Sequence, residues 1–249
     1  MKTRLIAVVA FSLLMTHVLQ AAEIRMLAAG AVKEAFLELV PQFERSSGNK
    51  VAATWTGSAD IRKRIGAGEA FDLVIVGAPD VDAFVKDGKM MSGSRVDIAR
   101  SGVGMAVKAG SPRPDISSSE AVKKALLSAR AVAYSPGPSG VYVQRLFDRL
   151  GIADQMKDKS KQAAPGVRVA QYVANGEAEL GFQQVSELVH EAGIDFLGPL
   201  PAEIQNVTVY SSGIPIGANA ESAKALQAFL SAPAAAPVFR KNGMDSSHP

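Results

Sequence analysis

Four short turns rich in glycine, serine and proline open predicted helices, and the first three of them follow predicted strands. In chain order these turns are Ala28–Ala31, Thr56–Ala59, Ser135–Gly140 and Pro165–Arg168. A helix start leaves backbone N–H groups without partners and carries a partial positive charge. Small side chains let an anion reach these N–H groups, and a serine hydroxyl adds a donor. Ordinary helix capping explains any single turn more simply, but the set, facing one cleft, predicts an anion site.

Two arginines and a tyrosine near these turns are candidate partners for a carboxylate ligand. Arg62 lies one turn into the helix that follows Ser58, Arg168 opens a later helix, and Tyr142 lies just after the third turn. A guanidinium binds a carboxylate through two parallel hydrogen bonds. The alternatives are a solvated basic face for Arg62, which belongs to the run 62–64, and a structural bridge between lobes for Arg168.

Residues that serve the commonest catalytic chemistries are scarce. The chain has no cysteine and 3 histidines, which argues against a zinc site and against thiolate catalysis. A Gly-x-Ser-x-Gly motif is absent, and His190 has no serine and aspartate pattern near it. A secreted hydrolase, the alternative from a different class, is therefore disfavoured. The sequence predicts a protein that is not an enzyme, with no catalytic residue, no metal and no cofactor.

The first 22 residues have the pattern of a secretory signal peptide. Lys2 and Arg4 precede the apolar run 5–14, and Ala21 and Ala22 suit cleavage. The run is shorter than the ~20 apolar residues of a membrane-spanning helix. Lys2 and Arg4 supply two of the charges in the net charge of +3. The chain that follows the signal peptide is therefore nearly neutral, which predicts no nucleic-acid partner. The signal peptide itself predicts a periplasmic protein.

The remaining chain alternates between short apolar runs and segments with helical spacing of apolar residues. This order predicts an α/β protein in which helices cover mostly parallel sheets. The alternation is interrupted by a serine- and proline-rich stretch at 110–119 and then restarts, which indicates two lobes. A ligand site is expected in the cleft between them. The predicted strands are Ile24–Ala28, Val51–Thr56, Asp72–Val76, Val103–Val107, Ala131–Tyr134, Leu180–Gln183, Ile194–Leu197 and Val207–Ile216.

Several segments resemble the periplasmic molybdate-binding family, in the same order and over about Glu23 to Met244. They are LAAGAVKEAF, TWTGSADIRKRIGAGEAFDLVIV, PSGVYVQRLFDRLG, PGVRVAQYVANGEAELGFQQ and VFRKNGM. The resemblance implies a solute-binding protein of an ABC importer with the two-lobed periplasmic-binding-protein type II fold. It implies a small-anion ligand, permease subunits in the inner membrane as partners, and a monomer. We expect one lobe from 23–102 with 211–249 and the other from 103–210.

The resemblance also implies which positions bind the ligand, and it shows two departures. The family's hydroxyl ligands are replaced at Ala31 and Gln184, while Ser139 adds a hydroxyl that the family lacks. Two lost donors correspond to ~3–6 kcal/mol of binding energy. The sequence therefore favours an organic polycarboxylate, with molybdate or tungstate as the alternative. The implied binding positions are Gly30, Ala31, Ser58, Ser139, Gly140, Val167, Arg168 and Gln184, to which the residue types add Tyr142 and Arg62.

Overall fold

The computed structural model describes residues 22–164 and 166–248, so the predicted signal peptide lies outside the described residues except for Ala22. The strands are β1 Glu23–Ala29, β2 Lys50–Thr56, β3 Leu73–Gly77, β4 Val96–Lys108, β5 Val132–Tyr134, β6 Ser160–Gln162, β7 Leu180–Gln184, β8 Ile194–Pro199, β9 Val207–Gly213 and β10 Asp245–Ser246. The helices are α1 Lys33–Ser47, α2 Ser58–Gly66, α3 Ala78–Lys86, α4 Ser119–Ser128, α5 Pro138–Arg149, α6 Ala153–Met156, α7 Val169–Ala174, α8 Val185–Leu188, α9 Ala220–Ser231 and α10 Ala236–Lys241. Short 3₁₀ turns are η1 Gly30–Val32, η2 Ala202–Ile204 and η3 Pro233–Ala235.

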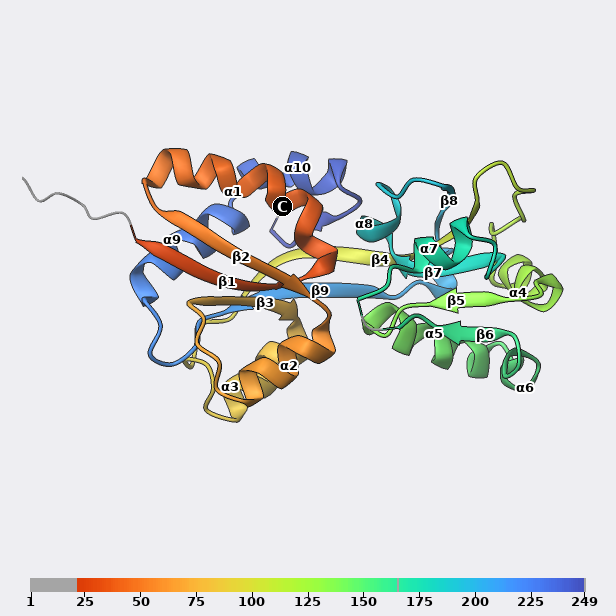
Figure 1. Ribbon diagram of the computed structural model, residues 1–249, viewed down its shortest axis with the longest axis horizontal. Helices are drawn as coiled ribbons and strands as arrows, with labels where there is room; N and C mark the ends of the chain where they lie inside the picture. Colours follow the sequence, from red (N-terminus) through yellow and green to blue (C-terminus); the bar gives the residue numbers. More distant parts are fainter. Residues whose placement is uncertain (1–21, 165, 249) are drawn as a thin grey trace, which may run out of the picture.

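A single sheet runs through two lobes (Figure 1). The strand order is β2-β1-β3-β9-β4-β7-β5-β6, and β8 and β10 also pair with β4. The first lobe contains the parallel strands β1, β2 and β3, and the second contains the parallel strands β5, β6 and β7. Antiparallel pairing of β4 with β9 and β7 joins the two groups. The predicted two-lobed α/β fold is confirmed.

Strand β4 belongs to both lobes and is longer than the sequence predicts. Its residues 96–102 pair with β9, and its residues 103–108 pair with β7 and β8. The apolar run predicted the strand only over Val103–Val107. The earlier half contains Asp97, Arg100 and Ser101 and has no apolar run, so its strand conformation comes from its pairing with β9 and β10.

The chain crosses between the lobes a second time between β8 and β9, and Gln205 links the two crossings. Its side-chain oxygen accepts a hydrogen bond from the Val103 N–H (2.8 Å). Its side-chain nitrogen donates to the carbonyl oxygens of Val103 and Leu200, both at 3.1 Å. One amide therefore satisfies backbone groups of both crossing segments, which holds them side by side.

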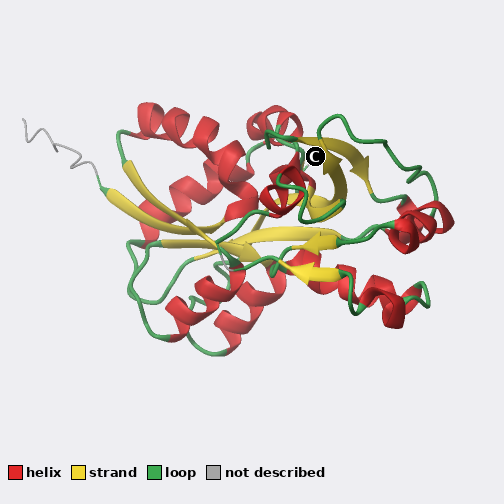
Figure 2. Cartoon of the chain, turned by 45° about the vertical axis from the view of Figure 1, so that its right-hand side comes forward, coloured by secondary structure: helices red, strands yellow, loops and turns green. Residues whose placement is uncertain are grey.

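Helices cover both faces of the sheet in the first lobe. Helices α1, α9 and α10 lie on one face, and α2 and α3 lie on the other (Figures 1 and 2). Helix α1 buries Ala35, Phe36, Leu39 and Phe43, which recur at helical spacing. Phe36 packs edge-on against Trp55 of β2, with ring centroids 6.0 Å apart. The apolar stripe of α1 thus fixes the orientation of the turn that precedes it.

The buried apolar residues form separate clusters in the two lobes. One cluster is built from residues 24–99 and 210–244, and two smaller ones are built from residues 103–204. Tyr210, which the sequence places at the end of the second lobe, packs into the first-lobe core. Within the described residues, no helix has both the length and the apolar character needed to cross a membrane.

Candidate functional site

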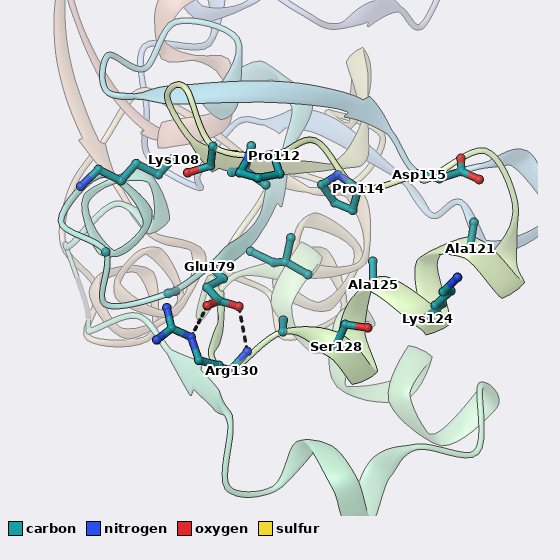
Figure 3. Close-up of a pocket in the computed structure, with 16 residues that line it drawn as sticks. Lys108, Pro112, Pro114, Asp115, Ala121, Lys124, Ala125, Ser128, Arg130 and Glu179 are labelled. Carbon is teal, nitrogen blue, oxygen red and sulfur yellow. Dashed lines mark hydrogen bonds and ion pairs between the residues drawn. The ribbon is translucent and has the colours of Figure 1, made fainter.

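One cavity lies within the second lobe and contains none of the predicted site residues. It has a volume of about 690 Å³ and is lined by the segment after β4, by α4 and by the turn before β7. Two of its charged groups bind each other: the Glu179 carboxylate accepts hydrogen bonds from the Arg130 backbone N–H (2.9 Å) and guanidinium (Figure 3). Proline and alanine side chains supply much of the remaining wall. Lys108, Lys124 and Asp115 also line this cavity, but none of the predicted anion-binding turns does.

The second cavity lies between the lobes and is lined mainly by the predicted turns. Its volume is about 320 Å³, within the range of small-molecule sites. The first lobe contributes η1, the end of β2 and the start of α2. The second lobe contributes the start of α5, the turn before α7, and α8. The predicted residues that line this cavity are Gly30, Ala31, Ser58, Ser139, Val167, Arg168 and Gln184.

Two serines stand at helix starts on opposite sides of this cavity. Ser58 is the first residue of α2, and Ser139 lies in the first turn of α5. Both side chains are buried, and the Ser139 hydroxyl shares a hydrogen bond of 2.8 Å with the Ser135 hydroxyl. The two helix starts therefore present hydroxyl and N–H groups to the cavity from both lobes.

Gly140 does not line the cavity, but it determines the shape of the turn that does. A Cβ atom at this position would lie 1.6 Å from the carbonyl oxygen of Ser135. The missing side chain lets α5 begin directly against the backbone of 134–135. That contact places Ser139 at the cavity wall.

Arg62 and Tyr142, predicted as carboxylate partners, are engaged elsewhere in this structure. The Arg62 guanidinium pairs with Asp80 at 3.1 Å. The Tyr142 hydroxyl donates to the Ile204 carbonyl oxygen (2.6 Å) and accepts from Arg149 (3.1 Å). Neither residue lines the interlobe cavity. The sequence placed them within one turn of Ser58 and Ser139, but each side chain leaves its helix in a different direction.

Gln184 and Val167 line the cavity with their donors already in use. The amide of Gln184 donates to the carbonyl oxygens of Ser101 (2.9 Å) and Gly102 (3.2 Å) and accepts from Thr208. The Val167 N–H donates to the carbonyl oxygen of Ala164 (3.0 Å). The Gln184 amide thus stabilises the strands that cross between the lobes and has no N–H group left for a ligand.

Arg168 is the guanidinium that the structure places at the cavity. It occupies the N-cap position of α7, and its side chain forms an ion pair with Glu191. Both residues belong to the second lobe, so the pair is not the bridge between lobes that the sequence left open. The Arg168 side chain is half exposed, which leaves part of the guanidinium facing the cavity.

Sequence reasoning missed Glu187, a carboxylate in the wall of the cavity. Glu187 lies in α8, and its Oε1 would be 3.5 Å from a Cβ atom at Gly30 of the first lobe. Burial raises the pKa of Glu187 from 4.5 to about 7, against the opposing effects of a Gln183 hydrogen bond and the Arg168 charge. The Glu187 residue is half-buried, and it belongs to the lining of the cavity.

Two further hydroxyl residues at the cavity were also missed. The Ser186 hydroxyl is buried and has no hydrogen-bond partner among the described residues. Tyr210 of β9 is buried, and burial together with the nearby Glu187 charge raises the pKa of its hydroxyl. Both are neutral donors to a ligand at neutral pH. No spacing pattern in the sequence marks them, because they reach the cavity from a short helix and a strand of different lobes.

The family model described as bacterial extracellular solute-binding protein matches residues 24–245. This chain belongs to that family. The solved periplasmic molybdate-binding protein of Azotobacter vinelandii superimposes with a TM-score of 0.75 at 18% identity, covering 89% of this chain and 98% of that one. The molybdate-binding protein of Escherichia coli is 24% identical over 89% of this chain and 88% of its own length. The family predicted from the sequence motifs is confirmed, and with it the type II fold.

A more similar relative corrects the prediction that the protein is not an enzyme. An aconitate isomerase from a Pseudomonas species is 36% identical over 226 residues, which covers 88% of this chain and 86% of that protein. The prediction was wrong because it rested only on the absence of motifs for serine, cysteine and metal catalysis. The absence of those motifs does not exclude other kinds of catalysis.

Proposed function

We propose that this protein binds a small polycarboxylate in the interlobe cavity and isomerises an unsaturated tricarboxylate of the aconitate type. The observation that carries the proposal is a titratable carboxylate, Glu187, in the wall of a cavity rich in neutral donors. The relative named aconitate isomerase supports the reaction. The resemblance of the fold to anion-binding proteins supports the class of ligand.

The donors around the cavity suit carboxylate groups. Helices α2 and α5 point their N-terminal ends at it from opposite lobes, with Ser58 and Ser139 in the first turns. Backbone N–H groups at such ends stabilise anions. Lys33 and Arg168 add positive charge on the two sides of the cavity. A ligand with several carboxylates can engage both lobes at once, which favours closure of the lobes on it.

The same cavity is less suited to a compact tetrahedral oxyanion. Ala31 brings no hydroxyl to the first turn, and the Gln184 amide is committed to strand contacts. The missing donors correspond to ~3–6 kcal/mol if the ligand were held as in the molybdate-binding family. Ser186 and Tyr210 also belong to the cavity lining and are further hydroxyl residues beside a larger ligand.

Titration calorimetry of the mature protein tests the class of ligand. We expect saturable heat with tricarballylate, a saturated tricarboxylate that cannot isomerise, and little heat with molybdate, tungstate or sulfate. Sub-micromolar molybdate binding with no heat from any polycarboxylate would show that the protein is an oxyanion-binding protein.

Ser58→Ala and Ser139→Ala are expected to weaken tricarballylate binding by ~1.5–3 kcal/mol each, the value of a hydrogen bond to a charged group. Ser139→Ala also removes the buried hydrogen bond to Ser135, so its free energy of unfolding should fall by ~1 kcal/mol. Calorimetry gives the affinities, and urea denaturation gives the stability. Unchanged affinity in both variants would place the ligand elsewhere.

Export to the periplasm, a monomeric state and transfer of ligand to an inner-membrane permease remain parts of this proposal. The extracellular description of the family and the periplasmic location named for a structural relative support export. An exported isomerase and a solute-binding protein share the requirement for a cleft that captures a dilute ligand.

A further inference from the structure

The position of Glu187 suggests a specific role in the cavity. Its carboxylate comes from α8 in the second lobe and lies against Gly30 in η1 of the first lobe. Helix α8 also packs on β4, the strand that both lobes share. The carboxylate therefore lines the cavity at a point where the two lobes meet. The buried Ser186 hydroxyl, which has no partner among the described residues, lies next to it in the chain.

Isomerising a tricarboxylate of the aconitate type requires either proton transfer or temporary loss of the double bond. The double bond does not rotate, but a methylene group lies next to it and also bears a carboxylate. Removing a proton from this methylene gives an anion delocalised over three carbons. Returning a proton to the former vinyl carbon moves the double bond and allows the other geometry to form.

We propose that Glu187 is the catalytic residue that carries this proton, an inference that rests on the proposed function. The Glu187 carboxylate takes a proton from the methylene carbon, and the C–H electron pair forms the new double bond. The electron pair of the old double bond moves to the former vinyl carbon and its carboxylate. Glu187 then returns the proton to that carbon. The carboxylate is regenerated, and no oxidant or co-reactant is needed.

The cavity supplies what this step needs besides the base. Negative charge grows on a substrate carboxylate during the transfer, and the donors at the starts of α2 and α5 stabilise it. Burial gives Glu187 a pKa near 7, which suits a group that must both accept and release a proton near neutral pH.

Other ionisable groups of the cavity are less suited to the role. Glu191 is held in an ion pair with Arg168. His190 is exposed at the cavity edge, and Glu34 lies on α1 beside Lys33. Tyr210 has a raised pKa and stays protonated at neutral pH, so it can donate a hydrogen bond but not accept the proton.

Glu187→Gln tests the inference, with Glu177→Gln as the matched control. Glu177 is an exposed carboxylate of the same lobe and lies outside both cavities. Conversion of cis- to trans-aconitate is followed by proton NMR, and tricarballylate affinity is measured by calorimetry. We expect Glu187→Gln to lower kcat by ~10²–10⁴-fold, the usual contribution of a general acid–base group. Its tricarballylate Kd should change by less than about fivefold, equivalent to ~1 kcal/mol.

The outcomes separate this inference from the proposed function. Wild-type protein without conversion would refute the proposed function. Wild-type conversion that Glu187→Gln retains within tenfold would refute only the role of Glu187. Loss of tricarballylate binding together with turnover would make Glu187 a binding residue and overturn the inference. If Glu187→Gln does not fold, Glu187→Asp carries the test: its kcat must fall while tricarballylate binding stays.

Discussion

Gly140→Ala is expected to lower the free energy of unfolding by ~3 kcal/mol or more and to abolish tricarboxylate binding. The added Cβ would lie 1.6 Å from the Ser135 carbonyl oxygen. This neighbour is backbone and cannot turn away, so the start of α5 must shift. Overpacking of this kind usually costs ~1–3 kcal/mol, and more when the backbone must move. Urea denaturation measures the loss of stability, and calorimetry measures the loss of binding.

Gly137→Ala is the matched control in the same turn. Its Cβ would meet the Ser135 hydroxyl at 3.6 Å, an ordinary contact, and its backbone angles are extended. We expect a change below ~1 kcal/mol in the free energy of unfolding. If Gly140→Ala is as stable as Gly137→Ala, α5 does not begin against the Ser135 backbone, and the described placement of Ser139 is wrong.

Glu187→Gln is expected to stabilise the ligand-free protein at alkaline pH by ~3 kcal/mol or slightly more and to leave its stability nearly unchanged at pH 4. The pKa of Glu187 rises from 4.5 to about 7 on folding, and each pKa unit corresponds to ~1.4 kcal/mol. The folded protein holds this proton more tightly than the unfolded chain. Stability therefore falls as pH rises from 4.5 to 7 and stays lowered above 7.

The measurement is the difference in unfolding free energy between wild type and variant across the pH range. Taking the difference cancels most contributions from other titrating groups of the cavity. Those groups are Lys33, Glu34, Arg168, His190, Glu191 and Tyr210. A constant difference from pH 4 to pH 9 would mean that the carboxylate is solvated and that its pKa is ordinary.

Much of the fold follows from local patterns in the sequence. The run Leu73–Gly77 is apolar throughout and forms a fully buried strand, and Pro79 stands in the first turn of the next helix. The small-residue turns after the strands identify most of the cavity wall, because parallel strands end at the same edge of a sheet. The sequence predicts these features because each of them depends on residues that are close together in the chain.

The parts that could not be predicted depend on contacts between distant segments. The first half of β4 is a strand because β9 lies beside it. Gln184 occupies the position of a family ligand, but its amide is taken by Ser101, Gly102 and Thr208. Arg62 was a candidate by its distance along the chain from Ser58, and its pairing with Asp80 is decided by the packing of α2 against α3.

Glu187 shows why the site chemistry was harder to predict than the site position. A glutamate in the first turn of a short helix is what ordinary capping would place there. Its unusual character comes from burial at the junction of α8 with η1 of the other lobe. No motif marks this carboxylate, and its catalytic role is a proposal that starts from its place in the cavity wall.

The most direct test of the central claim is proton NMR of cis-aconitate incubated with the mature wild-type protein at neutral pH. We expect trans-aconitate to appear at a rate proportional to protein concentration, with no other product, and to be absent with heat-denatured protein. Unchanged cis-aconitate after prolonged incubation with folded protein that binds tricarballylate would contradict the account and leave a binding protein without isomerase activity.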